Sequence, residues 1–179
     1  MIIGNPTIIN TFTVSGGSSQ AITSDITTTY KNYMFVFTDL NPATDGVEWQ
    51  VNFSTDDGSS WLNKTTTYFR AQVKSDGSGD DLSLITAQSL DNSTANACLS
   101  FDIGNGSDES SAGILYVYNP TGTTHNKYFS GHFTSYHASE YINDQYAQGF
   151  CASTSAVNRM KFEMSSGNFD GVIQMYGIK

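Results

Sequence analysis

Residues 33–53 of this chain read YMFVFTDLNPATDGVEWQVNF. In the second half, residues 47–53 alternate apolar and polar side chains around Trp49, a period of two that is typical of a β-strand with one buried face. Residues 33–37 are apolar throughout, as expected of a strand that is buried on both faces. Asn-Pro and Asp-Gly pairs mark residues 41–46 as a loop. We therefore predict a long β-hairpin whose aromatic side chains nucleate the core.

Similar short β patterns recur along the rest of the chain. The further predicted strands are residues 8–14, 21–27, 65–73, 97–103, 114–118, 127–136, 160–164 and 172–178. Residues 82–85 fit another short strand, and residues 139–148 fit either a short helix with Ser139 as N-cap or a loop followed by a strand. Nine or ten strands with little helix predict an all-β fold, an antiparallel β-sandwich of jelly-roll-like type. No domain boundary is evident, so residues 1–179 are expected to form a single β-sandwich domain.

We expect the core to contain the largest inward-facing side chains of these strands. The residues expected to be largely buried are Phe35, Phe37, Trp49, Val51, Phe53, Phe101, Tyr116 and Phe162. The last strand, residues 172–178, keeps β-forming residues almost to the chain end, and both of its faces are mostly apolar. It is therefore expected to be a central strand or to be covered by a neighbouring subunit, with an early strand as its partner.

The charge balance excludes one large class of partner. The chain has 8 Lys and Arg against 17 Asp and Glu, which gives a formal net charge of −9. Binding to nucleic-acid phosphates needs clustered basic side chains, and attraction to anionic membranes needs them too. The few basic residues are scattered, so we expect neither nucleic-acid binding nor membrane association.

The chain also lacks the usual sequence signals for export. Residues 1–6, MIIGNP, do not combine a basic segment with an apolar run, and no stretch approaches the roughly 18 apolar residues of a spanning helix. We expect a protein that is made in a cytoplasm, does not insert into membranes and, if it leaves the cell, leaves by a route other than secretion, such as lysis. Cys98 and Cys151 are expected to be free, buried thiols.

No motif points to catalysis. A Gly-x-Ser-x-Gly sequence and the local signatures of cysteine proteases are both missing, so we expect no enzyme and no catalytic residues. His132 and His137 are five residues apart and should point to opposite faces of a strand. No Cys-x-x-Cys pair is present for a structural zinc site. We expect no bound cofactor.

One acidic loop is a candidate for Ca²⁺. The sequence DGSGDD gives Asp76, Ser78, Asp80 and Asp81 oxygen-bearing side chains at spacings that resemble the start of a calcium loop. Asp81, however, stands where that pattern requires glycine, and Ala87 where it requires a bidentate glutamate. A solvated acidic loop is the alternative interpretation.

Exposed aromatic side chains beside Asn, Asp and Gln are typical of sugar-binding sites on β-sandwiches. Trp61 follows a turn, and Tyr118 and Tyr141 lie near strand ends, so these three are the candidate glycan-binding residues. The alternative for each is an ordinary place in the core.

Several segments resemble one group of viral proteins. TYKNYMFVF at 29–37 resembles the opening of β-rich tail and fibre-associated domains in tailed phages. STSAVNRMKF at 153–162, SGNF at 166–169 and YGIK at 176–179 are similar to the closing strands of these domains, and NKY at 126–128 resembles an element from their middle. The resemblance covers nearly the whole chain, and the motifs that carry it are structural.

The resemblance implies a non-enzymatic structural component of a tailed-phage virion, exposed on the capsid or the tail as a decoration, tail or fibre protein. Its partners would be other virion proteins and copies of itself. Because closed symmetry hides edge strands, we expect a homo-oligomer, with a trimer as the expected form. The alternative function is a carbohydrate-binding module that recognises a host surface glycan.

Overall fold

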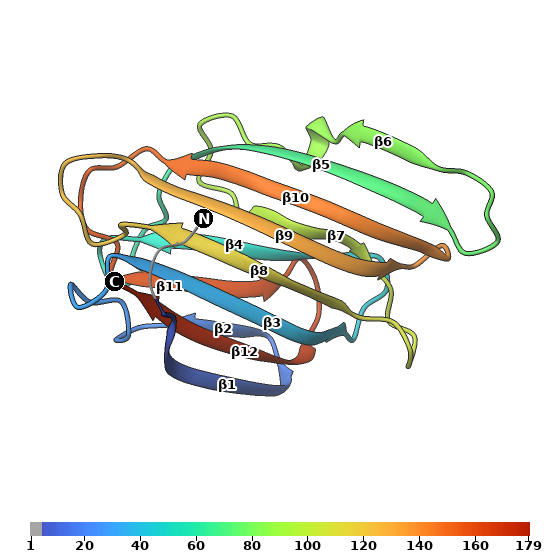
Figure 1. The fold of residues 1–179 in the computed structure, drawn as a ribbon, viewed down its shortest axis with the longest axis horizontal. Helices are drawn as coiled ribbons and strands as arrows, with labels where there is room; N and C mark the ends of the chain where they lie inside the picture. Colours follow the sequence, from blue (N-terminus) through green and yellow to red (C-terminus); the bar gives the residue numbers. More distant parts are fainter. Residues whose placement is uncertain (1–4) are drawn as a thin grey trace.

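The computed structural model describes residues 5–179, and these residues form twelve strands (Figure 1). In chain order the strands are β1 (Thr7–Gly17), β2 (Ser19–Ile22), β3 (Asn32–Pro42), β4 (Val47–Ser54), β5 (Lys64–Lys74), β6 (Asp81–Leu84), β7 (Ala97–Ile103), β8 (Ser111–Tyr118), β9 (Lys127–His137), β10 (Tyr141–Cys151), β11 (Arg159–Met164) and β12 (Phe169–Ile178). A single 3₁₀ turn, Thr86–Gln88, is the helical element of the described part. The predicted all-β, antiparallel fold with little helix is confirmed, with more strands than the nine or ten expected.

The strands pack as two layers. The large sheet has the order β1-β12-β3-β8-β9-β10-β5-β6, and the small sheet has the order β7-β4-β11-β2. The two sheets are joined at one corner, where Ile103 of β7 pairs with His137 of β9. In Figure 1 the large sheet lies in front, and the small sheet lies behind it. One cluster of buried apolar side chains fills the space between the layers.

The hairpin predicted over residues 33–53 is wrong, because its two runs belong to different sheets. β3 pairs with β12 and β8, whereas β4 pairs with β7 and β11. The loop at residues 43–46 carries the chain from one layer to the other. Phe37 and Trp49 therefore meet across the interior, with ring centroids 5.7 Å apart. The burial of both faces expected for residues 33–37 holds only in part, because the outward side chains of Met34 and Val36 are half-buried.

Six of the eight residues expected in the core are fully buried there, namely Phe35, Phe37, Trp49, Val51, Phe53 and Phe162. The other two expectations are wrong. Tyr116 lies on the outward side of β8, where it stacks on Tyr118 with ring centroids 6.3 Å apart. Phe101 is only half-buried, because it lies near the edge of the small sheet under the guanidinium of Arg70, 5.2 Å from its ring centroid.

Residues 139–148 form a strand and not a helix. Residues 138–140 turn the chain from β9 into β10, with Glu140 in the left-handed region at φ 68°. β10 then pairs along its whole length with β9 on one side and β5 on the other. The second of the two alternatives left open by the sequence is therefore the observed one.

The expectations for the last strand, the cysteines and the histidines are confirmed. β12 lies between β1 and β3 and pairs with both. Cys98 and Cys151 are free and buried. His132 faces outward from β9, whereas His137 faces inward and is buried.

No helix within residues 5–179 is long and apolar enough to cross a membrane. Residues 1–4, part of the segment inspected for a signal peptide, lie outside the described residues.

A buried lysine gives the fold a testable pH dependence. Lys64 has no exposed surface, and its Nζ donates hydrogen bonds to Asn52 Oδ1 at 2.6 Å and to the Leu62 carbonyl at 2.7 Å. Burial away from water lowers the pKa of Lys64 from 10.5 to about 8. Since the unfolded chain keeps this proton up to about pH 10.5, unfolding takes up a proton between pH 8 and 10.5.

We therefore expect the contribution of Lys64 to stability to rise with pH across that window, by on the order of 3 kcal/mol. The measurement is the difference in unfolding free energy between the wild type and Lys64→Met, taken in urea at pH 7.5 and at pH 10.5. The other titratable groups are common to the two proteins, so their contributions largely cancel in this difference. An unchanged difference at the two pH values would show that Lys64 keeps an ordinary pKa.

Candidate functional site

The outer face of the small sheet is polar and hydrogen-bonded to itself. Gln50 donates to Glu48, and Asn96 donates to both Gln50 and Glu163. Lys161 forms an ion pair with Glu163 at 2.7 Å. Such a network of polar side chains is well solvated.

The solvent-facing side of the large sheet differs in composition from that of the small sheet. From here on, "the outer face" means this surface of the large sheet alone. The large apolar side chains that are exposed in residues 5–179 are Ile8, Val73, Leu82, Leu84, Ile114, Tyr118, Tyr128 and Ile142. Strand register and alternation with the buried side chains place all eight on this face. Contiguous exposed apolar surface is uncommon on monomeric soluble proteins and marks interaction sites. The outer face is therefore the candidate functional surface.

The strand β5 shows how this face arises from the sequence. Its side chains alternate between the two faces of the sheet, as in any strand. The more apolar set of side chains, with Phe69 and Val73, points outward. The inward set contains Tyr68, whose hydroxyl is buried and bonded to Gln145. A strand with its apolar side turned away from the core is unusual unless something covers that side.

A row of stacked rings crosses the middle of the outer face. The His132 ring on β9 stacks on Tyr146 of β10 with centroids 4.4 Å apart, and Tyr146 stacks on Phe69 of β5 with centroids 4.9 Å apart. Ile114 of β8 and Leu84 of β6 extend the row at its two ends, opposite His132 and Phe69 respectively. The row is stiff, because each ring is held between cross-strand neighbours.

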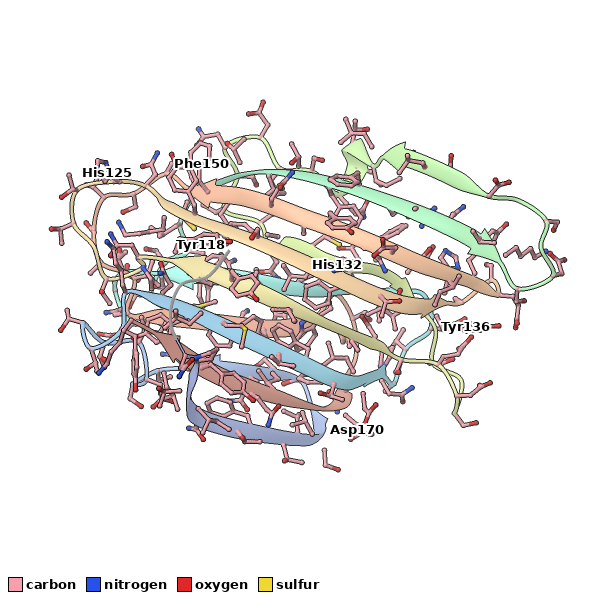
Figure 2. The ribbon with its side chains drawn as sticks, in the orientation of Figure 1. Tyr118, His125, His132, Tyr136, Phe150 and Asp170 are labelled. Atoms are coloured by element: carbon pink, nitrogen blue, oxygen red, sulfur yellow. The ribbon has the colours of Figure 1, made fainter. Side chains whose placement is uncertain are left out.

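A second aromatic group lies toward one end of the face. Tyr118, Tyr128 and Phe150 are directly opposite one another on β8, β9 and β10. In Figure 2, Tyr118 and Phe150 lie toward one end of the large sheet, Tyr136 toward the other end, and His132 between them. A cleft of about 440 Å³ is formed here, and we call it the aromatic cleft. Besides the three rings, its lining includes Thr65, Thr67, Ser130 and Gln148.

The three sequence-predicted glycan residues do not form one site. Tyr118 lines the aromatic cleft and is exposed. Trp61 lies in the connection between β4 and β5, with Lys161 Nζ 5.0 Å from its ring centroid. Tyr141 begins β10, at the opposite end of that strand from Phe150, and packs edge-on against His137. The sequence analysis did not single out Tyr128, which belongs to the predicted strand 127–136, or Phe150, which lies just beyond the segment 139–148.

The candidate calcium residues lie in and beside the hairpin loop between β5 and β6. The Ser78 hydroxyl and amide both donate to Asp76 Oδ1, and these bonds hold the pKa of Asp76 below its ordinary value. Lys74 pairs with the other carboxylate oxygen at 3.7 Å, and Asp81 accepts from Ser83. Across residues 5–179, no three His, Cys, Asp or Glu side chains converge as a metal site would require. The loop, which includes Asp80, thus shows a local turn and not an assembled set of cation ligands.

The buried histidine is held on both ring nitrogens. His137 Nε2 lies 2.6 Å from Asp102 Oδ2, and the Ser139 amide donates to His137 Nδ1 at 2.9 Å. With both nitrogens engaged, this ring fastens the turn between β9 and β10 and has no free nitrogen to activate a nucleophile. The exposed ring of His132 is paired with Asp144 through Nε2.

No protein-family model matches the chain, and comparison with curated proteins and with solved structures finds no significant match. Function is therefore inferred from the fold, the outer face and the sequence resemblance.

Proposed function

We propose that the protein is a non-enzymatic structural component of a tailed-phage virion, exposed on the capsid or tail, and that it assembles there through its outer face. The segments at both ends of the chain that resemble phage tail and fibre-associated domains support the viral part of this proposal. The observation that carries the assembly part is the placement of the eight exposed apolar side chains on one face. The protein would be made in the host cytoplasm and reach its final place by particle assembly.

The strongest apolar contribution comes from one edge of that face. Val73, Leu82, Leu84 and Ile142 lie near the free edge strand β6, and we call them the β6 patch. β6 has only four residues and pairs with β5 alone, so within the described chain its other edge faces solvent. An exposed apolar edge of this kind is a liability unless another chain covers it. A second copy or another virion protein would do so.

The first test is the oligomeric state of the isolated protein. We expect a homo-oligomer, proposed as a trimer, at micromolar concentration, because closed symmetry would cover the β6 patch in every copy. Light scattering should give the mass of three chains for the wild type and a lower mass for Leu84→Asp. A matched charge change in an exposed loop, Ser59→Asp, should leave the mass unchanged. A wild-type monomer under these conditions would contradict self-association.

The second test concerns the virion. The chain should co-purify with particles produced by the genome that encodes it, through density-gradient centrifugation, at many copies per particle. Particles without the chain would exclude a structural role in them.

A second candidate function is recognition of a host surface glycan. It is favoured by the position of Tyr118, which lies in the aromatic cleft beside two other rings. Glycan binding and a place in the virion are compatible, since the cleft and the β6 patch are made of different residues.

A further inference from the structure

We infer that the aromatic cleft binds a neutral saccharide, with Tyr128 and Phe150 as stacking residues and Gln148 and Ser130 as hydrogen-bonding residues. The inference rests on the second candidate function and names its site and ligand class. It does not depend on the place of the protein in a virion.

The cleft is built from two adjacent transverse rows of side chains. The first row is aromatic, with Tyr118, Tyr128 and Phe150 in register across three strands. In the second row, Ser130 pairs with Gln148. A pyranose has the same division, because its C–H faces are apolar and its rim carries hydroxyl groups. The aromatic rings of the first row match the apolar faces of the sugar. The amide and the hydroxyl of the second row match the hydroxyl groups of its rim.

The rings are positioned before any ligand arrives. Tyr128 and Phe150 lie with centroids 6.0 Å apart and planes tilted by 49°, and Tyr128 is 53% exposed. The Tyr118 hydroxyl shares a hydrogen bond of 2.9 Å with the Ser130 hydroxyl. This bond fixes the tip of Tyr118 against the polar row. Since the rings and their strands are held, little conformational freedom is lost on binding.

The lining of the cleft selects a neutral ligand. Its side chains are aromatic rings, hydroxyls and one amide, and they include no carboxylate, ammonium or guanidinium group. Aromatic platforms also bind single-stranded nucleic acids, but those sites add a positively charged groove for the phosphates. A chain of net charge −9 with an uncharged cleft lacks that component. A sugar without sialic acid, uronic acid or phosphate fits the lining.

The test is an array of neutral glucose-, mannose- and galactose-containing oligosaccharides, with uronic-acid oligosaccharides of equal length as the charged comparison. The best neutral oligosaccharide is then titrated calorimetrically into four variants. Tyr128→Ala and Gln148→Ala should bind about tenfold more weakly or worse. Trp61→Ala and Tyr141→Ala, which alter aromatic residues outside the cleft, should bind as the wild type does. Near-UV circular dichroism checks that each variant is folded.

Each other outcome overturns a different part of the inference. If Trp61→Ala or Tyr141→Ala loses binding and Tyr128→Ala does not, glycan recognition stands but the site is elsewhere. If uronic-acid oligosaccharides bind better than neutral ones, the ligand class is wrong. If nothing on the array binds, both the cleft inference and the glycan function fail, while the virion proposal is untouched.

Discussion

Replacing Trp49 by alanine is expected to lower the free energy of unfolding by about 3–5 kcal/mol. Trp49 has no exposed surface and lies where both layers meet. Its ring stacks on Phe162 of β11 at 5.9 Å and contacts Phe169 of β12 edge-on at 4.8 Å. Together with Phe37 of β3, these rings connect the small sheet to the large one. Removing the indole leaves a cavity that the surrounding strands, held by their ladders, cannot close.

The measurement is a urea titration of the wild type and Trp49→Ala. Trp61→Ala is the matched control, because Trp61 is only half-buried and lies outside the core, so its loss should cost about 1 kcal/mol or less. A cost below about 1 kcal/mol for Trp49→Ala would mean that the ring does not hold the layers together.

Deleting residues 176–179 is expected to leave the protein insoluble or unassembled. The segment belongs to β12, where Tyr176 is opposite both Ile8 of β1 and Met34 of β3. Ile178 is buried, and its carbonyl accepts a hydrogen bond from the Lys31 amide at 3.1 Å. Without these residues, β1 and β3 lose part of the strand between them, and unpaired edges become exposed next to apolar side chains.

The backbone at Gly177 adds to this effect. An added Cβ there would lie 2.2 Å from Tyr30 Cγ, so the Tyr30 ring packs directly on the glycine. The truncation would uncover that ring. Deletion of the exposed Lys179 alone is the control, and it should express in soluble form. For both deletions, circular dichroism measures folding, and the soluble fraction after expression measures solubility. A soluble, folded chain lacking residues 176–179 would show that the last strand is dispensable.

The alternation of apolar and polar residues predicted which segments are strands, and which side chains are buried, more reliably than it predicted which strands pair. For residues 33–37 and 47–53, the inward side chains are those expected, yet the two strands are partners across the core and not within one sheet. Periodicity describes one strand at a time, whereas pairing depends on the paths of the loops between strands. A connection as short as residues 43–46 can form a hairpin turn or cross between layers, and composition does not distinguish the two.

The strand β10 was obscured because its inward side chains are polar. Asn143 and Gln145 are buried, and Gln145 donates to Ser135 at 2.6 Å and accepts from the Phe101 amide at 2.6 Å. These partners compensate for the burial of the Gln145 amide, and they come from other strands. The sequence shows the polar residues but not the partners, so the alternation looked like that of a loop or a helix.

The sequence identified only part of the candidate site, again because it does not show which strands are neighbours. Tyr118 was identified because it is an aromatic residue near a strand end. Tyr128 and Phe150 become notable only once the register sets them beside it. The outward aromatic residues of β5 and β10, Phe69 and Tyr146, were also indistinguishable from core residues, because a functional face and a buried face carry the same apolar alternation.

The central claim is that the protein is a virion component that assembles through the outer face of its large sheet. A cryo-EM map of purified particles produced by the genome that encodes the chain tests it most directly. We predict density for the two-layered β-sandwich at repeated positions on the particle, with the β6 patch in contact with a neighbouring subunit. Particles that lack this density, or that hold the sandwich with its β6 patch facing solvent, would contradict the claim.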